Sequence, residues 1–365
     1  NDLCVENNLI KSHNDISTPD KYEIINAADC YVTPGLIDIH IHGGLGCNFL
    51  EFSEEKIILL KKDLLKHGVT SIYATVMTAS KNIMIDAIKS LSEYINKQDP
   101  LLPEILGLNI EGPFLSSEYR GIQPEKDLLT LNKEILKEFL TEKVKILTLA
   151  PELDEYGINI SYLKSNNIIP AMGHSLATFE QANKAIEQGI VLVTHLYNAM
   201  RRFHHRSPGI LAASLLSRNV YTEIIADGIH VHPAAIELVV KARPNNKIIL
   251  ISDSIALRDV DNYEYFVGED KITVKDNKAI NNKGVLSGSV LSLDDSIRNL
   301  VKWGVVEFSE AINYASINPA TLLGIDDKYG SIIPDKIANI VIWDKKTLKI
   351  KATIIQGHYH QHSAG

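Results

Sequence analysis

From residue 36 onward the chain alternates between short apolar segments and longer amphipathic ones. Eight apolar segments, most of them continuous and rich in β-branched residues, are Leu36–His42, Val69–Val76, Glu104–Glu111, Val144–Ala150, Ile168–Gly173, Ile190–Thr194, Val220–Ala226 and Lys247–Ile251. Such continuous apolarity is typical of parallel strands that are covered on both faces. After the fifth strand, Ser175 is the expected N-cap of a helix that ends at Gly189. Phe179, Ala182 and Ile186 fall on one face of that helix.

Eight strands that alternate with helices in one unbroken series predict an α/β chain built on a closed (β/α)8 barrel of the TIM type. An open doubly wound sheet is the competing arrangement. The two chain ends, residues 1–33 and 334–365, lack this alternation. Near the C-terminus, Ala338–Trp343 and Lys351–Ile355 have the pattern of strands. We therefore expect both ends to form one small β-sandwich domain beside a barrel domain of residues 34–333.

Length and charge narrow the classes of partner. The chain has 365 residues, which exceeds the ~250 of a typical barrel and leaves room for the second domain. Its formal net charge of −8 argues against a nucleic-acid partner, which requires a basic surface. No apolar run approaches the ~20 residues that cross a bilayer, so we expect no membrane partner.

The cysteines indicate the compartment. Cys4, Cys30 and Cys47 show no paired spacing, and free thiols are typical of a reducing compartment, so we expect a cytoplasmic protein. Cys47 follows a His-x-His segment and could line a site, but a small buried hydrophobe is the simpler interpretation. The chain opens at Asn1 on a strand-like segment, and we expect that a further segment precedes it.

Side chains that bind metal ions recur at the carboxyl ends of the predicted strands. The six residues of this set are His40, His42, Glu111, His174, His195 and Asp253. Each one alone could be a helix cap or a hydrogen-bonded core residue. In a (β/α)8 barrel, however, the carboxyl ends of all strands meet at one mouth, where active sites form. Alternation along the first strand also puts both imidazoles of the His-x-His segment on one face, so the set predicts a metal site.

The composition of this set favours hydrolysis. Neutral imidazoles with carboxylates suit zinc, and they also suit iron, manganese or cobalt as divalent ions. Glu111 could bridge two ions or serve one, so one or two ions per subunit are compatible with the set. Such an ion activates water at neutral pH. Asp253 is placed to accept the proton of that water and to return it to a leaving amine, which is the equipment for amide hydrolysis.

Two further groups of polar residues lie outside this set. A basic cluster that suits an anionic substrate, or that is only a solvated loop, comprises Arg201, Arg202, His204, His205 and Arg206. His230 follows the seventh strand near the same mouth, and a hydrogen-bonded structural histidine is the alternative there. A second alternating set, expected to be a solvated tail far from the mouth, comprises His358, His360 and His362.

Several segments resemble a known family. Pro34–Gly43 is similar to the opening motif of the amidohydrolase superfamily. The segments that resemble one of its families, the N-acetylglucosamine-6-phosphate deacetylases, are Glu111–Phe114, Gly173–Ser175, Thr194–Met200, Ala226–His230, and Asn318–Ala320 with Gly324. These motifs occur in the expected order between about residues 30 and 355, and Thr194–Met200 is the most specific of them.

The resemblance implies roles for the metal ligands. Glu111, His174 and His195 would hold the hydrolytic metal. His40 and His42 would hold a second ion, as in those members that have one. Asp253 matches the catalytic acid and base, and the implied reaction converts N-acetylglucosamine 6-phosphate into glucosamine 6-phosphate and acetate.

The resemblance also implies a substrate site. Asn198 and Ala199 match contacts to the sugar. Arg206 and His230 match the phosphate-binding pair, with the arginine supplied by the neighbouring subunit of a homodimer. A loop formed by Leu286, Ser287 and Gly288 matches the loop that closes over the substrate.

One position departs from the family pattern. Many members have histidine where this chain has Gln123, and that histidine helps to bind the substrate and polarise the acetamide carbonyl. Glutamine can donate a hydrogen bond but cannot carry charge, so either the rate or the preferred substrate could differ. The alternatives are another amidohydrolase, acting on an N-acetylgalactosamine 6-phosphate, a cyclic amide or an aminated base, and a non-catalytic scaffold with the same fold.

Overall fold

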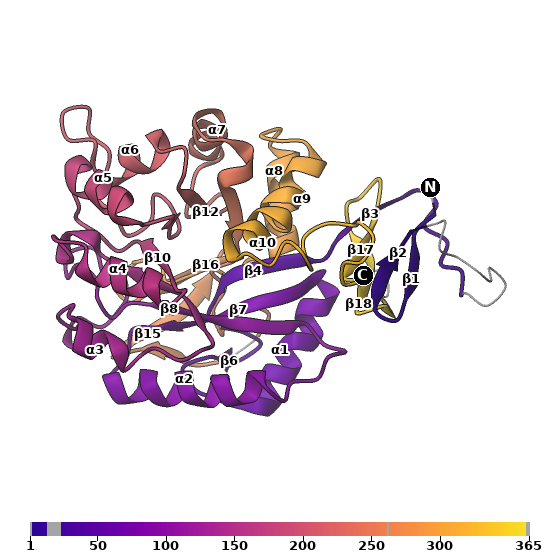
Figure 1. Cartoon of the computed structure of the whole chain (residues 1–365), viewed down its shortest axis with the longest axis horizontal. Helices are drawn as coiled ribbons and strands as arrows, with labels where there is room; N and C mark the ends of the chain where they lie inside the picture. Colours follow the sequence, from indigo (N-terminus) through magenta and orange to yellow (C-terminus); the bar gives the residue numbers. More distant parts are fainter. Residues whose placement is uncertain (1, 13–22, 261–262, 363–365) are drawn as a thin grey trace.

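The computed structural model describes residues 2–12, 23–260 and 263–362. Eight parallel strands form the barrel, and each pairs with the next one along the chain (Figure 1). Their bounds are β4 Leu36–Ile41, β7 Val69–Met77, β8 Glu104–Glu111, β9 Val144–Leu149, β10 Ile169–Met172, β11 Leu192–Val193, β12 Tyr221–Ile225 and β13 Ile248–Ile251. The last strand, β13, contacts the first, β4, so the sheet curls back on itself. The predicted fold class and all eight predicted strands are confirmed, and β11 is the most shortened.

Helices cover the outside of the barrel (Figure 1). The α-helices are α1 Glu54–Lys66, α2 Lys81–Ile95, α3 Lys133–Lys137, α4 Ile158–Ser165, α5 Phe179–Gln188, α6 Gly209–Leu216, α7 Pro233–Ala242, α8 Leu293–Lys302, α9 Phe308–Tyr314 and α10 Ile317–Leu323. Short 3-10 turns are η3 Glu125–Asp127, η4 Pro151–Leu153 and η5 Asn245–Lys247. Among the residues that the structure describes, no helix is both long and apolar enough to span a bilayer.

The start of α5 differs from the prediction. The N-cap is Thr178, whose hydroxyl accepts a hydrogen bond from the Gln181 backbone, while the Gln181 side chain accepts one from the Thr178 backbone. This reciprocal pair satisfies two backbone donors at once, which a cap at Ser175 would not. Ser175 was therefore the wrong cap, and its hydroxyl instead donates to Glu152 at 2.6 Å. Gly189 ends the helix as predicted.

Two apolar layers hold the barrel together. The outward faces of the strands pack against the helices in one large cluster. A second cluster, drawn from strands around the barrel and from α10, comprises Ile37, Ile39, Tyr73, Ile146, Ala171, Leu192, Tyr221, Ile225, Ile249, Ile251 and Ala320. Since this second cluster packs the inside of the barrel, polar functional groups are left to the carboxyl ends of the strands.

Both chain ends build a second sheet beside the barrel (Figure 1). Its antiparallel strands, in the order β19-β18-β17-β3, are β3 Cys30–Pro34, β17 Ile340–Asp344, β18 Ile350–Ile355 and β19 His358–Gln361. A hairpin of β1 Cys4–Glu6 and β2 Leu9–Lys11 lies against it, with Ile10 packed among Ala338, Ile340 and Ile354. The predicted pairing of the two ends is thus observed.

The sequence predicts a solvated tail for the C-terminal histidines, and this prediction is wrong. His358 and His360 belong to β19, which pairs with β18. His362 bonds to the side chain of Thr353 at 3.1 Å. The edge of β18 presents unpaired backbone groups, and the following segment satisfies them by adding a strand.

Two small elements near the barrel mouth were not predicted. A three-stranded antiparallel sheet of β14 Tyr265–Val267, β15 Asp270–Lys275 and β16 Lys278–Asn281 lies between β13 and α8 in the chain. A minimal hairpin of β5 Gly43–Gly44 and β6 Cys47–Asn48 follows β4. Cys47 is buried there as predicted, and burial raises the pKa of its thiol to about 12.

Trp343 joins two strands of the second sheet, β17 and β3, to each other and to helix α9. Its side chain is fully buried, its indole N–H donates to the Thr33 hydroxyl at 2.8 Å, and its ring packs edge-on against Phe308. Because Trp343→Phe removes both volume and the donor, we expect the free energy of unfolding to fall by about 1–3 kcal/mol. Urea denaturation measures this change. Trp303→Phe is the control, since Trp303 is only partly buried; an equal loss in both variants would contradict the prediction.

Candidate functional site

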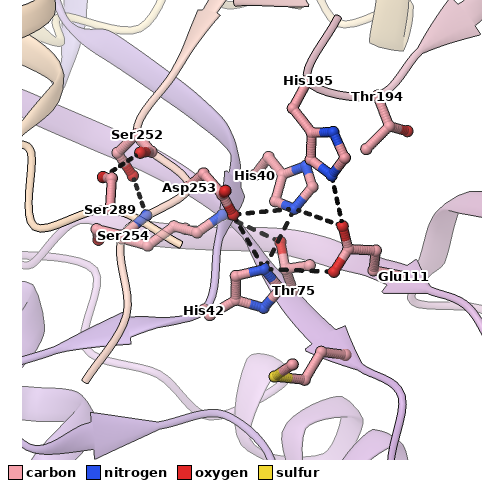
Figure 2. Close-up of polar contacts among 12 residues, drawn as sticks. His40, His42, Thr75, Glu111, Thr194, His195, Ser252, Asp253, Ser254 and Ser289 are labelled. Carbon is pink, nitrogen blue, oxygen red and sulfur yellow. Dashed lines mark hydrogen bonds and ion pairs between the residues drawn. The ribbon is translucent and has the colours of Figure 1, made fainter. Parts of the chain in front are cut away.

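The six predicted ligands converge at the carboxyl end of the barrel, and five of them are labelled in Figure 2. They come from the ends of β4, β8, β10, β11 and β13 or from the one or two residues that follow these strands. All are buried, with exposed fractions of 0% for His40, 5% for His42, 3% for Glu111, 5% for His174, 4% for His195 and 7% for Asp253. The structure therefore assembles the whole set that the strand ends predicted.

One group of ligand atoms surrounds the first carboxylate oxygen of Glu111. Its Oε1 lies 3.0 Å from Nε2 of His174 and 3.0 Å from Nε2 of His195. The two Nε2 atoms are themselves 3.1 Å apart. Three donor atoms from three strand ends thus lie within the spacing that one metal ion needs.

A second group shares the same carboxylate. Nε2 of His42 lies 3.5 Å from Oε2 of Glu111, and Nε2 of His40 lies 3.6 Å from its Oε1. The two imidazole Nε2 atoms are 3.3 Å apart. Oδ1 of Asp253 completes this side of the cluster at 3.2 Å from His42 and 3.5 Å from His40 (Figure 2).

Hydrogen bonds on the far side of two rings fix their orientation. Nδ1 of His174 lies 3.0 Å from the backbone carbonyl of Tyr119. Nδ1 of His40 lies 3.0 Å from a carboxylate oxygen of Glu223. An acceptor at Nδ1 requires the proton there, so the lone pair of Nε2 points into the cluster in both rings.

The backbone adopts unusual conformations at the ligands that follow strands. His174, His195 and Asp253 have φ angles of 48°, 27° and 50°, in a region that non-glycine residues seldom occupy. The surrounding hydrogen bonds hold them there, for example from the Asp253 amide to the His40 carbonyl at 2.9 Å. Such local strain is typical of functional sites, where it aims a side chain that regular structure would turn away.

The electrostatics keep both acidic ligands ionised. Burial alone would raise the pKa of Glu111, but the imidazoles of His174 and His195 hold it well below its usual range. The pKa of Asp253 is likewise lowered, because contacts to His42 and His40 outweigh burial. Burial opposes protonation of His40, yet Glu223 raises the pKa of that imidazole to about 10, so a metal ion that binds there would displace the proton from Nε2 and leave the one on Nδ1.

This donor set fits a divalent metal. Four imidazole Nε2 atoms and two carboxylates face one another, and two of the rings present lone pairs set by partners on their far sides. Nitrogen and oxygen donors of this kind suit zinc, iron, manganese or cobalt. The residues divide into a Glu111–His174–His195 group and a His40–His42–Glu111 group, each with the spacing for one ion.

The residues predicted to bind substrate lie around this centre. Oε1 of Gln123 accepts from the Thr78 backbone at 3.0 Å, and its Nε2 donates to Oε2 of Glu111 at 2.9 Å. The Asn198 side chain donates to the backbone carbonyl of His195, and the methyl group of Ala199 lies near Gly121. Gln123 thus contacts a ligand directly, a placement that the sequence did not predict.

The two predicted phosphate-binding residues have different settings. His230 is anchored by Asp227, whose Oδ2 lies 2.6 Å from its Nδ1 and whose Oδ1 accepts from two backbone amides. Arg206 lies on an exposed loop and contacts only groups of that loop among those described, with its guanidinium 3.0 Å from His205.

The predicted closing loop lies against the segment that carries Asp253. The amide of Ser289 donates to the Asp253 carbonyl at 2.8 Å, and the Ile255 amide donates back to Ser289. Ser287 is held by a bond from its amide to the carbonyl of Ala279 in β16. Leu286, Ser287 and Gly288 therefore connect the small three-stranded sheet to the segment of Asp253.

The sequence pattern did not identify two buried carboxylates that lie next to the ligands. Glu223 lies inside β12 and is fully buried, and Asp38 lies inside β4 with 1% exposed. Asp38 accepts from the backbone of His40 and Ser252, and burial raises its pKa to about 6. The available signal was an acidic residue within a strand that is otherwise apolar and covered on both faces.

Comparison with known proteins gives a consistent picture. Residues 31–359 match the model of the amidohydrolase family. The N-acetylglucosamine-6-phosphate deacetylase of Bacillus subtilis (strain 168) is 36% identical over 329 residues, which cover 89% of this chain and 83% of that protein. The N-acetylgalactosamine-6-phosphate deacetylase of Escherichia coli O157:H7 is 32% identical over 327 residues, covering 89% of this chain and 86% of that protein. The crystal structure of N-acetylglucosamine-6-phosphate deacetylase from Pasteurella multocida has a TM-score of 0.90 at 30% identity, covering 98% of this chain and 94% of that one.

Gly288 provides a test of how the closing loop supports the centre. Its φ is +68°, and a Cβ there would lie 2.5 Å from the Ile255 side chain and 3.1 Å from the Asp253 carbonyl oxygen. Gly284 has a similar φ of +76° but open space around it. Gly284→Ala should therefore lower the free energy of unfolding by the backbone strain alone, about 1–2 kcal/mol. Gly288→Ala should cost about 1–3 kcal/mol more and also lower turnover, because it displaces Asp253.

Urea denaturation and initial rates on both alanine variants measure the two effects. Equal stability and turnover in the two variants would show that the loop does not position Asp253.

Proposed function

The chain belongs to the amidohydrolase family, and from this premise we propose how its metal centre hydrolyses the acetamide of N-acetylglucosamine 6-phosphate to glucosamine 6-phosphate and acetate. The chain is a metal-dependent amide hydrolase of amino-sugar metabolism. The observation that carries the mechanism is the convergence of six buried ligand groups on one barrel mouth, with the ionised Asp253 among them.

Two sets of ligands would hold the metal. Glu111, His174 and His195 form the first, and His40 and His42 with the shared Glu111 form the second. Either one or two ions per subunit suit this arrangement, with zinc favoured over iron, manganese or cobalt. When bound, a divalent ion would lower the pKa of water and polarise the acetamide carbonyl.

Asp253 performs the proton transfers in this proposal. Its carboxylate is held ionised by His42 and His40, so it can accept a proton from the attacking water. The water oxygen forms a bond to the acetamide carbon, and the carbon–nitrogen bond breaks. Asp253 then donates the same proton to the departing nitrogen, so that the amine leaves neutral together with acetic acid, which releases the second proton of the water to solvent and becomes acetate. The residue thus ends each turnover ionised, as it began.

Gln123, Asn198 and Ala199 are the proposed contacts to the sugar and its acetamide. The Gln123 amide already donates to Glu111 and lies 3.4 Å from Nε2 of His174. A contact to the substrate carbonyl would replace one of these bonds. When Gln123 binds the substrate, its remaining hydrogen bond would still hold it to a metal ligand. Because its amide is uncharged, it donates a weaker hydrogen bond than a protonated histidine would.

The phosphate would be bound by His230 and Arg206, beneath the loop of Leu286, Ser287 and Gly288. Asp227 holds Nδ1 of His230, which leaves Nε2 for the phosphate. Arg206 extends from an exposed basic loop beside Phe203, whose side chain is 57% exposed. An exposed aromatic residue next to an arginine is typical of interface contacts, which supports a homodimer with Arg206 reaching the neighbouring subunit's site.

The compartment belongs to the same proposal. Cys4, Cys30 and Cys47 are free thiols in the structure. A reducing compartment keeps such thiols free, and this supports a cytoplasmic location.

A second candidate substrate is N-acetylgalactosamine 6-phosphate. The E. coli O157:H7 relative that carries this activity in its name is 32% identical to the chain, against 36% for the B. subtilis deacetylase. The two sugars differ only in the orientation of one hydroxyl, which the acid/base chemistry does not touch. Comparison of kcat/KM on both phosphosugars decides between them, and a higher value on the galactosamine derivative would overturn the first assignment.

Asp253→Asn tests the acid/base role. The amide cannot accept the proton, so we expect kcat to fall by at least roughly 100-fold. Four imidazoles and Glu111 remain, so metal content should stay near that of the unchanged protein. Acetate release and elemental analysis measure the two quantities. Asp259→Asn, in the same loop but exposed, is the control and should keep full activity. Substantial turnover in Asp253→Asn would assign the proton transfer elsewhere.

Arg206→Ala tests phosphate recognition. Hydrogen bonds to charged groups are worth about 1.5–3 kcal/mol, so kcat/KM on the phosphorylated substrate should fall by about 10–150-fold. For the unphosphorylated sugar, kcat/KM should fall much less. Arg202→Ala, in the same exposed loop, is the matched control. Equal losses on both substrates would remove Arg206 from the phosphate site.

Mixed dimers test whether Arg206 acts across the interface. A hybrid of one Arg206→Ala subunit and one Asp253→Asn subunit would contain one intact site if the arginine crosses to the neighbour. It would contain none if the arginine serves its own subunit. A rise in activity on mixing the two impaired variants, above the sum of their separate activities, is therefore the expected result, and its absence would place Arg206 in its own site.

A further inference from the structure

An acidic side chain occupies the interior of barrel strand β12. Glu223 is completely buried. Its neighbours at alternate positions, Tyr221 and Ile225, belong to the apolar cluster that packs the inside of the barrel, whereas Ile224 faces the outer cluster. Alternation along the strand therefore directs Glu223 inward, between two side chains of the inner apolar cluster.

The partners of Glu223 are parts of the metal centre. Its Oε2 accepts from Nδ1 of His40 at 3.0 Å and from the backbone amide of His195 at 3.1 Å. Its Oε1 has no hydrogen-bond partner among the described residues. Among the described residues, Glu223 forms its ion-pair contact with His40, and no lysine or arginine pairs with it.

A buried carboxylate of this kind is unfavourable unless positive charge lies nearby. The polar groups that Glu223 faces belong to one ligand from each of the two metal-binding groups. Its side-chain contacts among the described residues are to these two ligands, so the charge and orientation that it supplies to them explain its presence in the barrel interior.

We infer that Glu223 is a positioning residue of the metal centre, an inference that rests on the proposed metal-dependent function. Its carboxylate holds the proton of His40 on Nδ1, so that Nε2 presents its lone pair to an ion. The same oxygen restrains the backbone at His195, whose φ of 27° is otherwise unfavourable. One carboxylate thus orients a ligand in each group.

The four imidazoles differ in this respect. His174 has a neutral carbonyl as its Nδ1 partner, and Nδ1 of His42 and of His195 has no partner among the described residues. Among the described residues, His40 is the only one of the four whose Nδ1 atom has an anionic partner. The ion held by His40 and His42 therefore depends most on Glu223, and the ion held by the other group depends less.

Glu223→Gln removes the charge and keeps the shape. We expect the affinity for the ion at His40 and His42 to fall by about 10–100-fold, the usual effect of losing such an outer partner. The first measurement is the number of zinc ions per subunit, by elemental analysis after equilibration with buffered free Zn²⁺. The second is the dissociation constant from chelator competition. Both are independent of catalytic activity.

Two further variants make the result specific. Glu223→Asp keeps the charge but withdraws it from Nδ1 of His40, so its affinity should lie between those of Glu223→Gln and the unchanged protein. Asp294→Asn is the matched control, because Asp294 is a buried carboxylate 3.0 Å from Nδ1 of His67, outside the metal centre. It should leave zinc binding unchanged.

The outcomes separate this inference from the proposed function. Wild-type zinc stoichiometry and affinity in Glu223→Gln would overturn the positioning role, and if that variant does not fold, the same result in Glu223→Asp would overturn it. Absence of zinc binding by the unchanged protein, with iron, manganese and cobalt also tested, would instead contradict the metal-dependent function itself.

Discussion

The Glu111 carboxylate is the contact on which the arrangement of the site depends. One of its oxygens lies 3.0 Å from the imidazoles of both His174 and His195, and the other lies 3.5 Å from His42. These partners come from β4, β10 and β11, which are distant in sequence. Only a closed barrel in which every strand ends at one level can bring them to a single carboxylate. The register of β8 against its neighbours therefore determines whether the centre forms.

The fold and the convergence of the six candidate ligands could be predicted because they depend on regular features. Parallel strands covered on both faces are apolar throughout, and ligands at their ends stand out against them. The pattern also predicted the position of α5, but it gave the wrong N-cap. Ser175 and Thr178 are both residue types that cap helices, and only the reciprocal hydrogen bonds with Gln181 distinguish Thr178. Similarly, β19 was not expected because polar, histidine-rich sequence becomes a strand only when a neighbouring edge is available.

The residues that escaped prediction act through others. Glu223 and Asp38 lie within strands, where sequence alone does not show which groups lie opposite a side chain. Gln123 was expected to face the substrate, and its contact with Glu111 follows from the conformation of the loop after β8. In physical terms, ligands are specified by position along a strand, whereas their supporting groups are specified by contacts across the barrel.

The second sheet also bears on how the protein is made. Strand β3 ends at Pro34 and β4 begins at Leu36, so the strand that carries His40 is joined by one residue to a strand that pairs with β17. During synthesis, β3 emerges about three hundred residues before its partner, and this pairing is among the longest-range contacts of the chain. The barrel can begin to assemble while the ribosome is still at work, but β3, which leads directly into β4, gains its partner only once β17 has emerged. The support of the metal centre is thus tied to the emergence of β17, so a chain that ends before Ile340 would hold its first two histidines on a strand whose preceding segment, β3, lacks its partner.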